Sequence, residues 1–119
     1  MTPSSALVAF VALEHAAFLI LEMFLWTTPF GLKVFAQTPE AAAGSAKLAM
    51  NQGLYNGFLA AGLVWGLSAP PESGLAIKTF FLACVIIAGA FGAATVSPRI
   101  ALIQALPALV ALVLLRAGR

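Results

Sequence analysis

Residues 79–98, TFFLACVIIAGAFGAATVSP, form an unbroken run without Asp, Glu, Lys or Arg. A helix needs about 20 predominantly apolar residues to cross the hydrocarbon core of a bilayer. A second uncharged run of this kind covers residues 48–69. These two runs predict membrane-spanning helices and decide the fold class.

The composition of the whole chain agrees with that prediction. Of its 119 residues, 62% are hydrophobic and 8% are charged, and the mean hydropathy is +1.04. A soluble domain carries about 25% charged residues, so we expect an integral membrane protein. The length leaves no room for an added soluble catalytic module, which predicts a single membrane domain over residues 1–119. The six basic residues are isolated, so no nucleic-acid partner is expected.

Four spans are expected, with both termini on the same side of the membrane. They are predicted at about residues 5–27, 48–69, 77–97 and 100–116. The last uncharged run is short, but Arg99 and Arg116 bound it and can extend their side chains to the two interfaces. The predicted fold class is therefore all-α, a four-transmembrane-helix bundle. Three basic residues fall on each side, so the positive-inside rule gives no orientation.

The loop between the first two spans has features of its own. Trp26 and Phe35 flank Lys33, a pattern typical of an interfacial segment at headgroup depth. Further along, Thr38 precedes Pro39 and Glu40, as an N-cap precedes a first-turn proline and acid. The second long helix is therefore predicted to begin before the membrane.

The first span is irregular because it carries three ionisable residues, Glu14, His15 and Glu22. At about 100° per residue, His15, Glu22 and Trp26 share one face of a helix, and Glu14 lies on its flank. Each ionisable group deep in a bilayer costs about 2.5–3.5 kcal/mol. This cost indicates a use, and Glu14, His15 and Glu22 are the predicted catalytic residues. The alternative is that they only fix helix packing through buried hydrogen bonds.

A second set of polar residues is predicted to bind a ligand in an intramembrane cleft. On the second span, amide and phenol side chains occupy one arc, and Gly53 and Gly57 lie on a different face. With a rise of 1.5 Å per residue, the polar groups lie near the depth of Glu22. Pro107 should disturb the fourth helix next to Gln104. The predicted ligand-binding residues are Trp26, Asn51, Gln52, Tyr55, Asn56, Thr95 and Gln104.

Five motifs are spread along the chain: ALEH at 12–15, LEMF at 21–24, WTTP at 26–29, KVF at 33–35 and NQGLYNG at 51–57. They resemble a bacterial family of small four-span membrane proteins of unknown function. The resemblance covers nearly the whole chain and implies the four-span fold. Some members of that family carry an epimerase label, but the family implies no catalytic residues.

Three functions fit these features. The first is an acid–base isomerase or epimerase acting on a lipid or isoprenoid-like substrate, with Glu22 nearest the ligand and His15 and Glu14 moving protons. The second is a proton-coupled small-molecule transporter working as a dimer. The third is a non-catalytic membrane scaffold or accessory subunit. We expect no cofactor and no metal, a homodimer through Gly53 and Gly57, and a place in the bacterial inner membrane.

Overall fold

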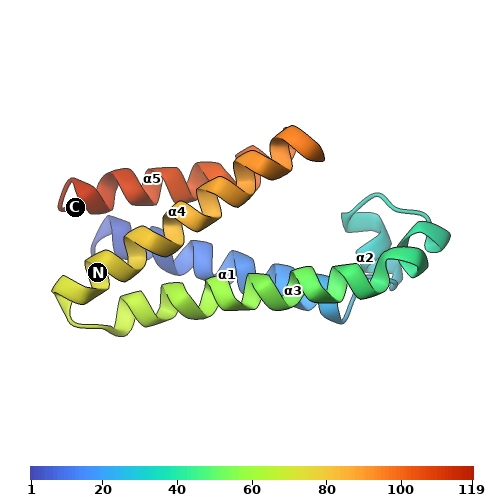
Figure 1. Ribbon diagram of the computed structural model, residues 1–119, viewed down its shortest axis with the longest axis horizontal. Coiled ribbons are helices and arrows are strands. Elements are labelled where there is room, and N and C mark those ends of the chain that lie inside the picture. The colour runs from blue at the N-terminus through green and yellow to red at the C-terminus, as the bar shows by residue number, and fades with distance from the viewer. The chain divides into compact units, whose positions relative to one another are not determined.

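The computed structural model describes all 119 residues, and its regular elements are all helices, with no strand (Figure 1). This confirms the all-α fold class. In chain order the elements are α1 (Pro3–Met23), α2 (Pro29–Val34), α3 (Pro39–Ser68), α4 (Pro71–Thr95), the π-helical segment η1 (Ala101–Ala105) and α5 (Leu106–Arg116).

Two of the helices, α1 and α4, are long and apolar enough to cross a membrane. The longest helix, α3, has 30 residues, but it carries Asn51, Gln52 and Asn56 within its uncharged part. The apolar stretch Ala101–Arg116 is shorter than a full span. By length and composition, therefore, two of the four predicted spans meet the requirement for crossing a bilayer.

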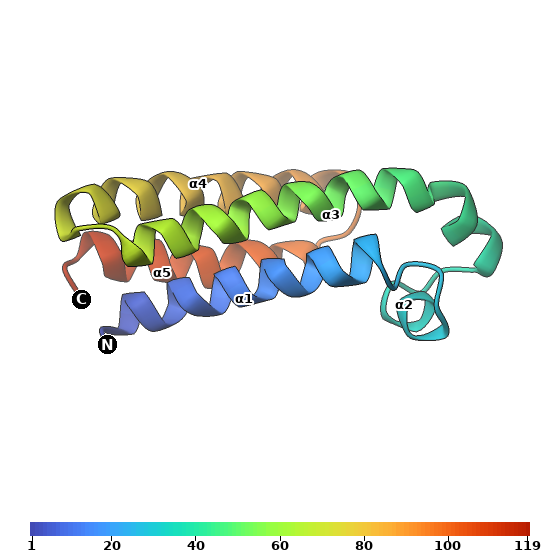
Figure 2. The ribbon, with the colours of Figure 1, turned by 90° about the horizontal axis from the view of Figure 1, so that it is seen from below.

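The chain divides into two compact units, each of which contains part of α1 and part of α3. Unit 1 consists of Met1–Leu13 and Leu59–Arg119, and unit 2 consists of Glu14–Phe58. Both chain termini belong to unit 1. They lie at the same end of that unit in both views (Figure 2).

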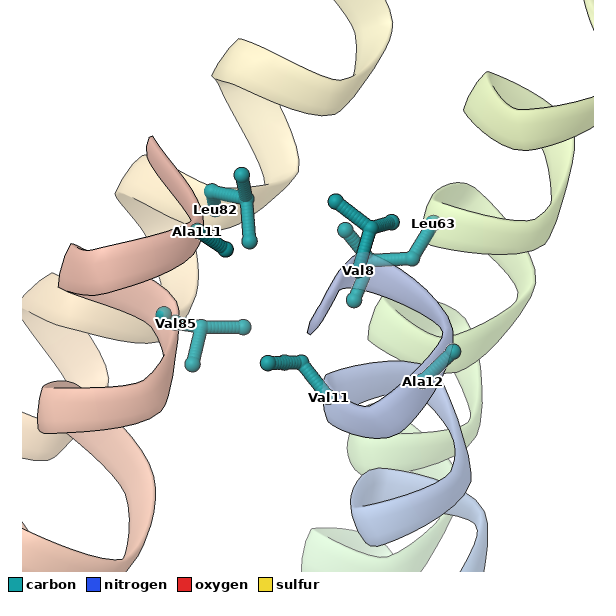
Figure 3. Close-up of a cluster of buried hydrophobic side chains, with 8 residues drawn as sticks. Val8, Val11, Ala12, Leu63, Leu82, Val85 and Ala111 are labelled. Carbon is teal, nitrogen blue, oxygen red and sulfur yellow. The ribbon is translucent and has the colours of Figure 1, made fainter. Parts of the chain in front are cut away.

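The core of unit 1 is built from small and branched apolar side chains of α1, α3, α4 and α5 (Figure 3). Its buried members are Val8, Val11, Ala12, Leu63, Leu82, Val85, Ala108 and Ala111. Two glycines of α3, Gly62 and Gly66, lie where α3 meets α4. A Cβ atom at Gly62 would collide with the ring of Phe81, and one at Gly66 would lie 2.5 Å from Cγ of Lys78. The two glycines therefore let α4 pack closely on α3.

The backbone before Pro107 departs from α geometry, as the sequence predicts. The N–H of Leu106 donates to the carbonyl of Ala101, five residues back, at the end of η1. Proline has no N–H and its ring crowds the carbonyl four residues earlier, and a π turn is one way to relieve that conflict. Gly89 on α4 packs against this segment, because an added Cβ atom would lie 2.9 Å from the backbone nitrogen of Ala105.

Replacing Gly89 with Ala should lower the free energy of unfolding by about 1–3 kcal/mol, because the new methyl group would push against backbone that cannot turn aside. The matched control is Gly44→Ala, since a Cβ atom at Gly44 meets nothing within 4 Å. At Gly44 the same change should stabilise α3 by up to about 1 kcal/mol. Denaturant titration followed by circular dichroism measures both. Equal effects of the two substitutions would contradict the close contact of α4 with η1.

In unit 2, a threonine side chain caps the N-terminus of α2 and of α3. The Thr28 side chain accepts a hydrogen bond from the backbone N–H of Gly31 at 3.2 Å. The hydroxyl of Thr38 accepts one from the N–H of Ala41 at 3.1 Å. Each bond satisfies an otherwise unpaired donor in a first helical turn. The predicted N-cap at Thr38 is therefore confirmed.

Just after α2, an alanine adopts a backbone conformation that is usually taken by glycine. Ala36 has a φ of 52°, in the left-handed region. The N–H of Gln37 donates to the carbonyl of Leu32 at 2.9 Å, and the N–H of Ala36 to that of Lys33 at 3.3 Å. These two bonds form a Schellman motif, whose left-handed position is usually glycine.

Ala36→Gly should therefore stabilise the protein by up to about 1 kcal/mol, because glycine adopts this conformation without the steric cost that alanine carries. Ala43→Gly is the control, because Ala43 is exposed within α3 and the same change there should cost up to about 1 kcal/mol. The two variants should shift the unfolding midpoint in opposite directions. A loss of stability in both would argue against the left-handed conformation at Ala36.

Candidate functional site

A hydrogen bond between Glu22 and Asn56 joins α1 to α3 inside unit 2. Nδ2 of Asn56 donates to Oε1 of Glu22 at 2.5 Å. Gly53, three residues before Asn56, lies on the same face of α3 and brings the helices together. The prediction that the glycines occupy a different face from the polar arc is therefore wrong for Asn56. A Cβ atom at Gly53 would lie 3.1 Å from Cβ of Glu22 and 2.6 Å from Cγ of Met23. The short distance between the two backbones lets the Asn56 amide reach the carboxyl.

Gly57 extends this contact by one turn of α3. A Cβ atom there would lie 2.6 Å from Cδ1 of Leu19, so Gly53 and Gly57 both pack on α1. The two glycines therefore allow a neighbouring helix to approach, and that neighbour is a helix of the same chain. Because α1 covers this face, the glycine pair no longer argues for a homodimer.

A second polar pair lies further back on α1. His15 is fully buried, and its Nδ1 lies 4.0 Å from Oε1 of Glu14, whose side chain is 11% exposed. The ring of Phe18 meets the imidazole edge-on, with 5.2 Å between centroids. Oε1 of Glu14 makes no hydrogen bond to the protein although it is buried. A carboxyl group and an imidazole so placed can exchange a proton with each other or with a bound molecule.

The three predicted catalytic residues therefore form two groups along one helix. Seven or eight residues separate the pair at Glu14 and His15 from Glu22, which is about 10–12 Å at 1.5 Å per residue. That distance is too long for both groups to hydrogen-bond one reacting atom, since such bonds measure about 3 Å. The structure thus separates the Glu14 and His15 pair from the hydrogen-bonded carboxyl of Glu22.

Trp26 lies in the turn after α1, which ends at Met23, so the prediction that it shares a helical face with His15 and Glu22 is wrong. It has a structural partner that the sequence does not predict. Its Nε1 donates to the hydroxyl of Ser45 on α3 at 3.1 Å, and its ring lies 4.7 Å from that of Phe35. These contacts tie the turn after α1 to the segment that follows α2. Nothing in the spacing of the residues marks Ser45, because its contact depends on how α1 and α3 are rotated about their axes.

The other predicted ligand-binding residues have different surroundings. Asn51, Gln52 and Tyr55 are exposed, and Tyr55 retains 52% of its accessible surface. Of the four polar residues predicted on this arc of α3, Asn56 is the one bonded to α1. The arc therefore divides into one residue that faces α1 and three that face outward.

Thr95 and Gln104 belong to unit 1, whereas Glu22 and Asn56 belong to unit 2. The Thr95 hydroxyl donates to the carbonyl of Phe91 on its own helix at 2.7 Å. Gln104 lies within η1 and is half-buried. The Thr95 hydroxyl therefore bonds back to its own helix, and Gln104 lies in the π-helical segment before Pro107.

The chain matches the family described as protein of unknown function (DUF1304) over residues 9–116. It therefore belongs to this family, which confirms that the resemblance of its motifs is to an uncharacterised family. The comparisons with curated proteins and with solved structures found no match.

Removing the Asn56 amide should loosen unit 2. Asn56→Ala leaves the partly buried Glu22 carboxyl without its donor, which should lower the free energy of unfolding by about 1–3 kcal/mol. Asn51→Ala is the matched control, because Asn51 is exposed on the same helix and should change stability by less than about 0.5 kcal/mol. Denaturant titration of both variants checks this. Equal stabilities would show that the bond to Glu22 does not hold α3 to α1.

Proposed function

We propose that this chain is an integral membrane protein. The most apolar windows of α1 and α4 are only 28% and 22% buried, which is unlike the core helix of a soluble protein. On α4, large apolar side chains face outward, with Phe80, Ile87 and Phe91 between 62% and 69% exposed. Exposed apolar surface of this extent marks contact with another apolar phase or partner, and lipid tails would contact it along the whole helix.

We propose further that α3 and the segment formed by η1 and α5 also cross the bilayer. With 30 residues, α3 exceeds the length of about 20 that a span requires. Its Asn56 is already bonded to Glu22, which reduces the cost of placing both groups in hydrocarbon. Arg99 and Arg116 bound the shorter last segment and lengthen its effective span. This arrangement is a four-helix membrane bundle.

For the activity, we propose acid–base isomerisation or epimerisation of a lipid-like substrate. The observation that carries this proposal is the pair at Glu14 and His15, 4.0 Å apart, with His15 fully buried and Glu14 largely so. An isomerisation that shifts a double bond adds a proton at one carbon and removes one at another, and an epimerisation removes a proton and returns one at the same carbon. Either reaction needs a proton donor and a proton acceptor near each other and consumes nothing. Glu14 and His15 supply these two groups.

Glu22 and Asn56 would hold the polar end of the substrate. Their carboxyl and amide groups can bond to a hydroxyl or an amine. They lie about 10–12 Å along α1 from the proton-exchanging pair, so an amphiphile anchored at Glu22 would carry its apolar chain past His15. This separation favours a lipid or isoprenoid-like substrate over a small polar metabolite.

Proton-coupled transport is the second candidate, favoured by the same separation. Two ionisable groups a few turns apart on one membrane-crossing helix can act as successive proton-binding stations. An isomerase uses the two groups for different tasks, whereas a transporter passes protons through both of them. The two functions therefore predict different assays.

We expect Glu14→Gln and His15→Ala each to lower turnover of a copurifying lipid by about 100-fold or more, because each removes a proton-transfer group. Glu22→Gln should instead weaken retention of that lipid. Glu40→Gln is the control, because Glu40 is exposed at the start of α3. Native mass spectrometry of purified protein, before and after incubation with lipid extract, identifies the ligand and any product.

Substrate-dependent proton flux into liposomes, lost in Glu14→Gln and Glu22→Gln, would favour the transporter instead. If all the variants matched the unmodified protein in both assays, the polar pairs would be structural. In that case the scaffold function would explain them better than either catalysis or transport.

A further inference from the structure

A recess of about 390 Å³ lies at the end of unit 1 that holds both chain termini. It is formed by the start of α1, the turn between α3 and α4, and the end of α5. Its volume falls within the range of small-molecule sites. None of the ten predicted site residues lines it, so it is separate from the polar pairs of unit 2.

The recess is lined by basic and hydroxyl side chains. Lys78 and Arg119 supply two positive charges, and Thr2, Ser4 and Ser5 supply three hydroxyl groups. The hydroxyls form one cluster, since Oγ1 of Thr2 lies 3.2 Å from Oγ of Ser4 and donates to Oγ of Ser5 at 2.8 Å. Cations beside hydroxyl donors are the groups that bind phosphate oxygens.

The local charge balance also favours an anion. Unit 1 carries the basic residues Lys78, Arg99, Arg116 and Arg119 and one acidic residue, Glu72. Glu72 is exposed in the first turn of α4 and is not among the lining residues. A bound anion would therefore meet attraction from the wall without an opposing carboxylate side chain in the lining.

Gly66 makes room for the lysine. Lys78 is partly buried two turns into α4, and a Cβ atom at Gly66 would lie 2.5 Å from its Cγ. The lysine stem thus packs over a position on α3 that has no side chain. Its ammonium group is attached by a flexible stem that can extend to the helix end.

We propose that this recess binds the phosphate of an anionic phospholipid. The proposal rests on the membrane location proposed above, but not on the proposed reaction. Both candidate spans begin at the recess, α1 at Pro3 and α4 at Pro71, which places it at headgroup depth. Basic pockets between membrane helices at that depth bind anionic headgroups. Lys78 and Arg119 pair with the phosphate, and the hydroxyls bond to its oxygens.

The test offers the purified protein an equimolar mixture of phosphatidylglycerol and phosphatidylcholine and measures the retained lipids by native mass spectrometry. We expect phosphatidylglycerol to be preferred. Lys78→Gln and Arg119→Gln should each lower that preference about five-fold, since each removes one charge near the headgroup. Lys78→Arg keeps the charge and should retain most of the preference. Arg99→Gln removes a charge of unit 1 outside the recess and should have little effect.

Equal losses in Lys78→Gln and Arg99→Gln would show general charge attraction and overturn the site. Displacement of phosphatidylglycerol by millimolar inorganic phosphate would show that the ligand is free phosphate, which overturns a lipid site. Release of the unmodified protein from vesicles by alkaline carbonate would instead contradict the membrane location. Lipid turnover should be unchanged in Lys78→Gln. The test of phospholipid binding in the recess is therefore independent of the test of the reaction proposed for Glu14 and His15.

Discussion

An apolar helix that carries ionisable groups needs a partner for each of them, and in this chain the partner of Glu22 is Asn56 on α3. The bond requires the two helices to approach closely, which Gly53 and Gly57 permit because their Cβ atoms would overlap the side chains of α1. A single constraint thus fixes both the rotation of α3 and the use of its glycine face. It also determines which amides face outward.

Packing in unit 1 follows a similar rule, in which small residues set the distances between helices. The buried cluster contains three alanines and three valines but no aromatic side chain, and Gly62, Gly66 and Gly89 lie where α4 meets its neighbours. Many large apolar residues, among them Phe80, Ile87 and Phe91, are instead exposed. Small residues at helix contacts and large ones outside are the distribution expected when lipid, not protein, covers the outer surface.

Local features were predictable from the sequence, and those that depend on helix rotation were not. The N-cap at Thr38 and the disturbance before Pro107 follow from the chemistry of a few neighbouring residues. The match over residues 9–116 confirms the resemblance to a family of unknown function. Asn56 was predicted on one arc with Asn51 and Tyr55. The position of α1, which the sequence does not reveal, decides that Asn56 is bonded and that the other two are exposed. Ser45 and the left-handed Ala36 carry no sequence signal, because hydroxyls and alanines occur throughout such helices.

The central claim is that α1 carries Glu14, His15 and Glu22 inside the bilayer, and spin labelling tests it most directly. Leu13, next to Glu14, is 72% exposed, so a nitroxide on Leu13→Cys in a Cys84→Ser background should leave the fold intact. In liposomes, oxygen should relax this label more strongly than a water-soluble nickel chelate, and a label on the exposed Ala43 should show the reverse. Equal, high nickel accessibility at both positions would contradict the account.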